Sequence, residues 1–165
     1  MLVVGVDPGT ATTGYALVAE NTDGEVRLDC YGVIETRAGE PMPARLLSIH
    51  SELSALIRET RPEAMAVEEL FFSRNTTTAL SVGQARGVVL LAAAQAGLPV
   101  YEYKPAEVKQ AVVGYGGAGK PQIQEMVRMM LGLAEVPRPD DAADAIAVAI
   151  CHLHSQRLRQ LMAEG

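Results

Sequence analysis

Acidic residues stand at three places in the chain where the neighbouring residues are apolar. They are Asp7, the pair Glu68 and Glu69, and the pair Asp141 and Asp144. Carboxylates gathered in one place repel one another, and a hard divalent cation removes that cost. Carboxylate and water ligands favour Mg²⁺ or Mn²⁺, and two such ions about 4 Å apart can activate a water and stabilise the leaving oxygen of a phosphodiester. If the three stretches meet in the fold, the sequence predicts a two-metal phosphodiester hydrolase.

Asp7 directly follows the apolar run 2–6 and precedes Pro8 and Gly9, which break a strand and allow a tight turn. Short apolar runs bounded by turn residues are typical of buried strands, so we expect Asp7 at the end of a central strand. Open α/β sheets bind their ligands at such strand ends. The alternative is that Asp7 only caps the turn, because Asp before Pro-Gly is common turn chemistry.

Glu68 and Glu69 follow a second short apolar run, 64–67. Adjacent residues of a strand point to opposite faces of the sheet, so the two carboxylates do not share a site and one of them is a candidate for it. The alternative is a solvated strand end with no role in chemistry. The residue types alone do not choose between Glu68 and Glu69.

A helix is expected to begin at Asp140, which is a natural N-cap residue. Asp141 and Asp144 are three residues apart and therefore lie on one face of that helix, in line with the apolar Val148. Acidic residues also favour a helix N-terminus through its dipole, which is enough to account for Asp140 and Asp141. Asp144 is more than a turn inside the helix among apolar residues, which favours an inward-facing role.

The apolar periodicity predicts the elements that must position these acids. Strands are expected at 2–7, 14–19, 26–34, 64–69 and 98–103, and helices at 44–59, at 76–96, from 104, at 122–133 and from 140. Short turns join the first three strands, which predicts that these strands are antiparallel. With 165 residues, the chain is expected to form one domain, 1–165, of the α/β class.

The two phenylalanines of the chain, Phe71 and Phe72, stand in an expected loop beside Arg74. An aromatic ring next to a basic residue can stack on an unpaired base, which makes Phe71 and Arg74 candidate DNA-binding residues. The alternative is that both rings belong to the core.

A glycine-rich stretch, 114–119, ends in Lys120. It lacks the G-x-x-x-x-G-K-[ST] order of a nucleotide-binding phosphate loop, because Pro121 follows the lysine. We expect either a mobile loop that delivers Lys120 to a phosphate or a plain linker.

Ala79, Gly83 and Gly87 recur every four residues along one side of the expected helix 76–96. Small residues at this spacing allow another backbone to come close. That backbone belongs either to the same domain or to a second subunit.

The net charge of −6 argues against a nucleic-acid partner, but the charge is unevenly distributed. Residues 1–72 hold 5 basic and 12 acidic residues, whereas residues 73–128 hold 6 basic and 3 acidic ones. A basic middle beside a cluster of carboxylates suits a bound polyanion. Ordinary variation in surface charge is the alternative.

Four further residues are expected to have structural roles only. Cys30 and Cys151 lie in apolar patterns and are predicted to be buried thiols rather than a disulfide. His152 and His154 lack the paired spacing of a zinc site and are predicted to be surface imidazoles. The chain shows no membrane-spanning run and no charged-then-apolar leader, so we expect a cytoplasmic protein.

Five stretches, taken in order, resemble the RuvC-type Holliday-junction resolvases of the ribonuclease-H-like nuclease superfamily. They are GVDPGTATTGYALV, AVEELFFSRN, LSVGQARGVVLLAA, VYEYKPAEVKQAVVGYGGAGKPQIQEMV and DDAADAIAVAICHLH. The resemblance implies four catalytic and metal-binding acids, which correspond to Asp7, Glu68, Asp141 and Asp144, and so selects Glu68 over Glu69. It also implies that Lys109 and Lys120 lie near the scissile phosphate, with Lys120 taking part in catalysis. Phe71 corresponds to the aromatic residue that contacts bases at the branch point.

The resemblance further implies a five-stranded mixed sheet, with its first three strands antiparallel, flanked by helices. It implies a homodimer, for which Ala79, Gly83 and Gly87 are the candidate contact. The implied reaction is Mg²⁺-dependent, with two ions per active site and Mn²⁺ as a substitute. It nicks two strands of a four-way DNA junction symmetrically and leaves 5′-phosphates and 3′-hydroxyls, in homologous recombination and DNA repair. The implied partners are junction DNA and the branch-migration proteins RuvA and RuvB, with no membrane.

Two other functions are weighed against this one. A non-catalytic junction-binding module would keep the fold without the chemistry. An actin-like phosphotransferase also carries a strand followed by Asp, Gly and Thr, but such proteins need two domains around the nucleotide and this chain supplies one.

Overall fold

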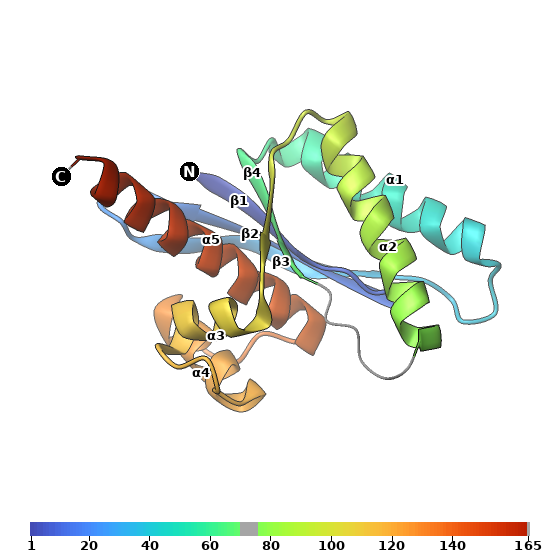
Figure 1. The fold of residues 1–165 in the computed structure, drawn as a ribbon. Helices are drawn as coiled ribbons and strands as arrows, with labels where there is room; N and C mark the ends of the chain where they lie inside the picture. Colours follow the sequence, from blue (N-terminus) through green and yellow to red (C-terminus); the bar gives the residue numbers. More distant parts are fainter. Residues whose placement is uncertain (70–75, 165) are drawn as a thin grey trace.

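The computed structural model describes residues 1–69 and 76–164, which form a sheet with helices on both faces (Figure 1). The strands in this part are β1 (Leu2–Asp7), β2 (Thr12–Glu20), β3 (Val26–Glu35), β4 (Ala64–Glu68) and β5 (Val100–Tyr103). The helices in this part are α1 (Met42–Thr60), α2 (Thr76–Gln95), α3 (Pro105–Val113), α4 (Lys120–Met130) and α5 (Asp140–Glu164).

The sheet has the strand order β3-β2-β1-β4-β5. The short connections β1–β2 and β2–β3 make antiparallel pairs, whereas β4 lies parallel to both β1 and β5. Parallel neighbours need a crossover, and α2 supplies it between β4 and β5. The predicted five-stranded mixed sheet of the ribonuclease-H-like type, with its first three strands antiparallel, is confirmed.

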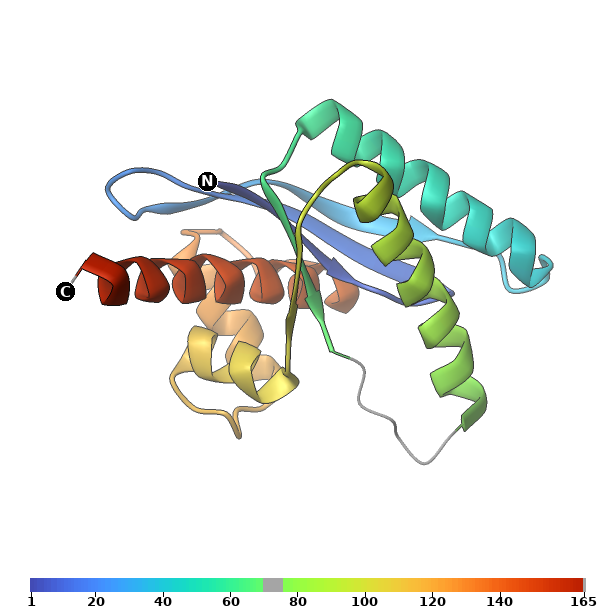
Figure 2. The same cartoon turned by 45° about the horizontal axis from the view of Figure 1, so that its top comes forward.

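Alternate residues of the central strands supply two separate cores. Val4, Val6 and Val67 pack beneath α1 and α2, while Val3 and Ala66 pack beneath α3, α4 and α5. Figure 2 shows these helix layers on opposite faces of the sheet. The period of two along a strand therefore assigns each strand residue to one layer or the other.

Two glycines allow α5 to lie directly on the sheet. A Cβ atom on Gly5 of β1 would overlap the main-chain carbonyl of Ala145, and one on Gly14 of β2 would overlap that of Asp141. Neither glycine has the positive φ that favours this residue type, so space rather than conformation requires it. The first turns of α5 are thus held in backbone contact with the two central strands.

The structure corrects two of the predicted burial states. Cys30 is exposed, because it lies on the edge strand β3, most of whose residues are not buried. His152 is fully buried, because α5 is covered by the sheet on one side and by α3 on another. The burial of Cys151 is confirmed.

The His152 ring contacts two tyrosines of β5. Its Nδ1 lies 2.7 Å from the Tyr103 hydroxyl oxygen, and its ring centroid lies 4.4 Å from that of Tyr101. Burial, and secondarily the charge of Arg159, lowers the pKa of His152 from 6.5 to about 4. The folded protein therefore holds His152 neutral at pH values where the unfolded chain protonates it.

This lowered pKa predicts a loss of stability in acid. Between pH 6.5 and about 4 the unfolded state binds a proton that the folded state does not, so the free energy of unfolding falls as the pH falls. His152→Asn keeps an acceptor for Tyr103 and does not titrate. We expect the stability advantage of the wild type over this variant to shrink by roughly 3 kcal/mol from pH 6.5 to pH 4 in urea unfolding. A constant difference across that range would contradict the prediction.

Within residues 1–69 and 76–164, no helix combines the length and the apolar character needed to cross a membrane.

Candidate active site

Asp7 and Glu68 lie side by side at the ends of two parallel strands. Val6 of β1 is in register with Val67 of β4, and both valines pack beneath α1 and α2. The next residue of each strand therefore faces the opposite layer, which contains α5. Strand alternation thus directs Glu68, rather than Glu69, towards the face that Asp7 shares.

Asp141 and Asp144 enter the same place from α5. In the β1–β2 register Asp7 is opposite Gly14, and Gly14 is the residue that contacts the main chain of Asp141. The close approach of helix to sheet therefore brings Asp141 next to Asp7, and Asp144 follows one helical turn later on the same face. The four acids predicted from the sequence therefore converge at the carboxyl ends of β1 and β4.

The pKa values show that these carboxylates share an electrostatic environment. Burial, followed by the charges of Asp144, Glu68 and Asp141, raises the pKa of Asp7 from 3.8 to about 7. Burial and then the charge of Asp144 raise the pKa of Glu68, against the opposing charges of Lys109 and Lys120. Burial also raises the pKa of Asp144. Ionising Asp7, Glu68 and Asp144 together is therefore unfavourable unless positive charge is nearby.

Lys120 supplies positive charge at this site. Its Nζ lies 2.9 Å from Asp144 Oδ2 and 3.5 Å from Asp140 Oδ2. Residues 114–119 connect α3 to α4, and Lys120 is the first residue of α4, two residues before the expected helix start at 122. Proline is favoured in the first turn of a helix, and Pro121 directly after the lysine marks a helix start. Lys120 is thus presented by the first turn of a helix.

Asp140 is bound by residues outside the acid cluster. Its Oδ1 accepts a hydrogen bond from Gln124 Nε2 at 2.9 Å and from Arg138 Nη1 at 2.8 Å. The hydrogen bond from Gln124 is the largest of the effects that lower the pKa of Asp140. Asp140 therefore links the start of α5 to α4 rather than joining the acid cluster.

The donor set fits a hard divalent cation, because all four converging groups are carboxylates. The raised pKa of Asp7, about 7, indicates that the cluster needs positive charge to ionise fully. As the side chains stand, no three His, Cys, Asp or Glu residues within 1–69 and 76–164 are arranged to hold a single ion. The four acids thus fit a divalent metal by their chemistry and charge, and not by their present arrangement.

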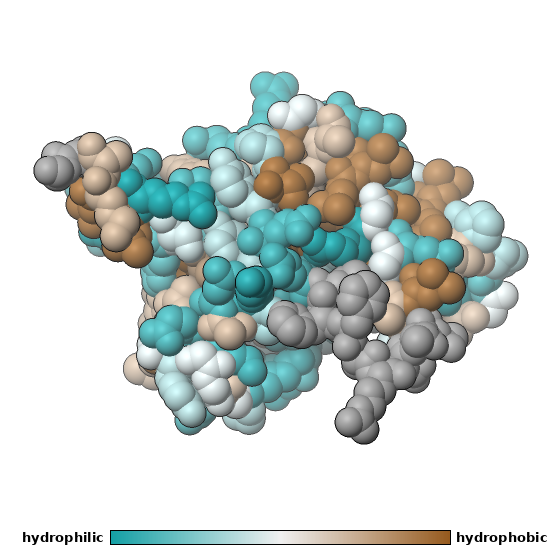
Figure 3. Space-filling model, viewed as in Figure 1, coloured by the Kyte–Doolittle hydropathy of each residue, from teal (hydrophilic) through white to brown (hydrophobic). Residues whose placement is uncertain are grey.

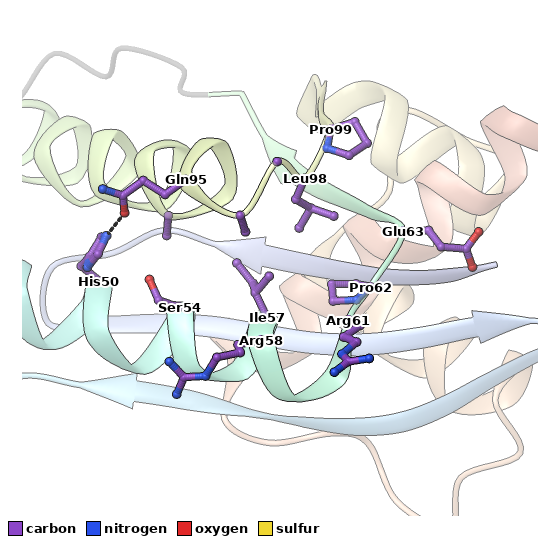
Figure 4. A pocket seen from close by; sticks show the side chains of 13 residues that line it. His50, Ser54, Ile57, Arg58, Arg61, Pro62, Glu63, Gln95, Leu98 and Pro99 are labelled. Atoms are coloured by element: carbon purple, nitrogen blue, oxygen red, sulfur yellow. Dashed lines mark hydrogen bonds between the residues drawn. The ribbon is translucent and has the colours of Figure 1, made fainter.

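A cleft on another part of the molecule lies away from these acids. A cleft of about 660 Å³ between α1 and α2 includes His50, whose Nε2 lies 2.7 Å from Gln95 Oε1 (Figure 4). Its other walls include Pro62 and Pro99, which precede β4 and β5. The cleft thus lies at the opposite ends of the parallel strands from Asp7 and Glu68.

A model of the family described as "Crossover junction endodeoxyribonuclease RuvC" matches residues 3–152. The chain belongs to the RuvC family. The crossover junction endodeoxyribonuclease RuvC of Desulfitobacterium hafniense is 60% identical to it over 162 residues, which make up 98% of both chains. A solved structure of Thermus thermophilus RuvC is 44% identical, with a TM-score of 0.90 over 96% of this chain and 97% of that one. The structure of T. thermophilus RuvC in complex with Holliday junction substrate is 42% identical, with a TM-score of 0.88 over 96% of each chain.

The remaining candidate residues lie on α3, on α2 and outside the described residues. Lys109 lies on α3 and acts on the pKa of Glu68. Phe71 and Arg74 lie outside the described residues. Ala79, Gly83 and Gly87 lie on α2, and in residues 1–69 and 76–164 no atom lies within 4 Å of a Cβ added to Gly83 or Gly87. Packing against this part of the chain therefore does not require those two glycines.

Gly5 and Gly14 support the candidate site, although the sequence pattern did not single them out. They allow α5 to lie directly on β1, which carries Asp7, and on β2 beside it. A signal for both was present, because an isolated glycine within a strand pattern often marks a close backbone approach.

Proposed function

We propose that the protein is a structure-selective endonuclease that resolves four-way DNA junctions by nicking two strands symmetrically, in homologous recombination and DNA repair. The observation that carries the proposal is the convergence of Asp7, Glu68, Asp141 and Asp144. Burial, together with the charges of the three other acids, raises the pKa of Asp7 to about 7. Membership of the RuvC family supports the junction as substrate, as does the T. thermophilus RuvC structure in complex with Holliday junction substrate.

The proposed cofactor is Mg²⁺, two ions per active site, with Mn²⁺ as a substitute. Nucleases of this family use divalent metal ions, and carboxylate ligands favour these two. Asp7, Glu68, Asp141 and Asp144 would hold them. Bound ions would supply a water of lowered pKa and stabilisation of the charge that develops on the phosphate.

Two lysines are proposed to act on the DNA backbone. Lys120, whose side chain is 48% exposed, keeps its ammonium beside Asp144 and so places a positive charge where a phosphate would meet the acids. Lys109 is the other nearby positive charge: burial and Asp144 raise the pKa of Glu68, and the charge of Lys109 lowers it, which favours the ionised carboxylate. Phe71 and Arg74 are proposed to contact bases and backbone at the junction.

The proposed assembly is a homodimer that forms through α2. Leu80 and Leu91 are 67% and 50% exposed, and they lie in line with Gly83 and Gly87 at spacings of three, seven and eleven residues. Figure 3 shows hydrophobic side chains over α1 and α2. A twofold dimer suits a substrate in which two equivalent strands are cut. Analytical ultracentrifugation at several protein concentrations tests the dimer.

RuvA and RuvB are proposed as further partners of the protein.

The experiment that tests the function is incubation with a synthetic four-way junction and Mg²⁺, with a linear duplex of the same sequence as control. We expect paired nicks at symmetric positions in the junction, with 5′-phosphate and 3′-hydroxyl ends, and an intact duplex. Equal cutting of both substrates would contradict the proposal. Binding of the junction without cleavage at any metal concentration would favour a non-catalytic module.

Lys120→Ala is expected to slow junction cleavage by roughly 10²- to 10³-fold, because one charge beside the reacting phosphate is removed. The dissociation constant for the junction should change far less, since DNA binding uses many contacts. Single-turnover cleavage and filter binding measure the two quantities. Arg58→Ala removes an exposed positive charge from α1, by the distant cleft, and should leave cleavage unchanged. A wild-type rate for Lys120→Ala would remove this lysine from the site.

A further inference from the structure

The main-chain carbonyl of Glu68, the last residue of β4, accepts a hydrogen bond from a side chain of α2, on the face of the sheet opposite α5. Nη1 of Arg86, on α2, donates a hydrogen bond to the carbonyl oxygen of Glu68 at 2.7 Å. Nη2 of the same guanidinium lies 2.8 Å from Glu102 Oε2, on β5. The side chain of Arg86 is only 11% exposed. One largely buried cation therefore joins α2 to the ends of two neighbouring strands.

This contact occurs at the last hydrogen bonds between β4 and β5. β4 ends at Glu68, and the N–H of Glu69 makes a further bond to the Tyr103 carbonyl at 2.7 Å. The Glu68 carbonyl takes its hydrogen bond from Arg86 instead. A buried guanidinium is costly unless its donors are used, so the bond constrains the Glu68 peptide strongly.

The guanidinium also fixes how the Glu68 carbonyl is oriented relative to the Glu102 carboxylate. Because the guanidinium is planar and rigid, binding both acceptors at once sets their separation and orientation, which a lysine ammonium would not do. The Glu68 carbonyl and the Glu68 Cβ share one backbone unit, and the carboxylate leaves that unit towards the acid cluster on the α5 face. A rotation of the peptide would move the carboxylate away from Asp7 and Asp144.

We infer that Arg86 is a positioning residue for Glu68: it holds the end of β4 by its carbonyl and thereby keeps the Glu68 carboxylate in the acid cluster. Arg86 acts from the α2 side of the sheet and reaches the cluster only through Glu68. The inference rests on the proposed function, because it assigns Arg86 to the same acid cluster.

The test compares Arg86→Gln and Arg86→Lys with the wild type. Partners that orient metal-ligating carboxylates are typically worth about 10- to 100-fold in metal affinity or activity. For Arg86→Gln we expect the Mn²⁺ concentration at half-saturation, measured by calorimetry without DNA, to rise about 10-fold and single-turnover cleavage to slow about 10- to 100-fold. The junction dissociation constant should stay within about threefold, since no DNA contact is removed. Arg86→Lys keeps the charge but not the fork and should fall in between.

Arg58→Gln is the matched control, because it removes an exposed arginine from α1. It should match the wild type in every measurement. If Arg86→Gln does not fold, Arg86→Lys carries the test with an expected shift of several-fold. A wild-type Mn²⁺ midpoint in the folded variants would overturn the inference, even if their melting temperatures were lower. If the wild-type protein failed to cut junctions, the proposed function would fall, whereas the Mn²⁺ midpoints would still decide the role of Arg86.

Discussion

Replacing Asp7 by asparagine is expected to abolish junction cleavage while leaving the protein able to bind junction DNA. Asp7 is the acid whose pKa is raised furthest towards neutrality, to about 7, by burial and by the three other carboxylates. Asparagine keeps the size but cannot supply the negative charge that a divalent cation needs. We expect a loss of at least about 10³-fold in single-turnover cleavage, in line with removal of a central catalytic group.

The binding measurement separates this loss from unfolding or loss of DNA contact. The dissociation constant for a four-way junction, measured in Ca²⁺ or in chelator, should be unchanged or lower, because one charge that repels the phosphates is gone. Glu69→Gln is a matched control from the residue after β4, on the other side of the chain, and should retain cleavage. A loss of binding as large as the loss of cleavage would count against a metal-binding role for Asp7.

The same variant should make the metal-free protein more stable. Because the folded-state pKa of Asp7 is about 7 and its unfolded value is 3.8, the wild type loses stability as the pH rises from 4 to 7, and the loss persists above pH 7. Asp7→Asn lacks this cost. At pH 8 in chelator we expect its free energy of unfolding to rise by roughly 3 kcal/mol and its Tm by about 5–10 °C.

Replacing Gly14 by alanine is expected to damage both stability and catalysis through one added methyl group. Its Cβ would overlap the carbonyl oxygen and carbon of Asp141. Backbone atoms cannot turn aside as a flexible side chain can, so α5 must move off the sheet, at a cost of about 1–3 kcal/mol or more. A misplacement of about 1 Å can cost 10²-fold in rate, and the first acids to move would be Asp141 and Asp144.

Gly39→Ala is the control for this variant, because an added Cβ there meets no atom within 4 Å. We expect Gly14→Ala to lower Tm by several degrees and to cut at least 100-fold more slowly at a temperature where it is folded. Gly39→Ala should stay within about 0.5 kcal/mol of the wild type. Wild-type cleavage and Tm for Gly14→Ala would show that α5 does not depend on this contact.

The pair Glu68 and Glu69 shows where reasoning from the sequence stops. Strand alternation predicts that the two side chains diverge, but it does not say which one faces α5. The resemblance to RuvC-type resolvases selected Glu68, and the register of Val6 with Val67 gives the physical reason. The choice depends on which face of the sheet each helix covers, and that is a property of the assembled layers.

At Lys120 and His152 the structure differs from what the sequence pattern predicted. The Pro121 that excluded a phosphate loop also marks the helix start at Lys120, whereas the apolar pattern placed that start at 122. His152 has a polar side chain that the sequence pattern assigns to the surface. It is buried because α5 is enclosed by more than one neighbour.

The sequence alone was enough to determine the strands, the helices and the positions of the acids at strand ends and at a helix start. Apolar periodicity and turn chemistry act over a few residues and need no tertiary partner. The tertiary structure alone decided that β1 and β4 are neighbours, that α5 rests on Gly5 and Gly14, and that Arg86 reaches the Glu68 carbonyl. These are contacts between segments up to about 140 residues apart, as for Gly5 and Ala145, and their energies depend on which surfaces meet when the layers pack.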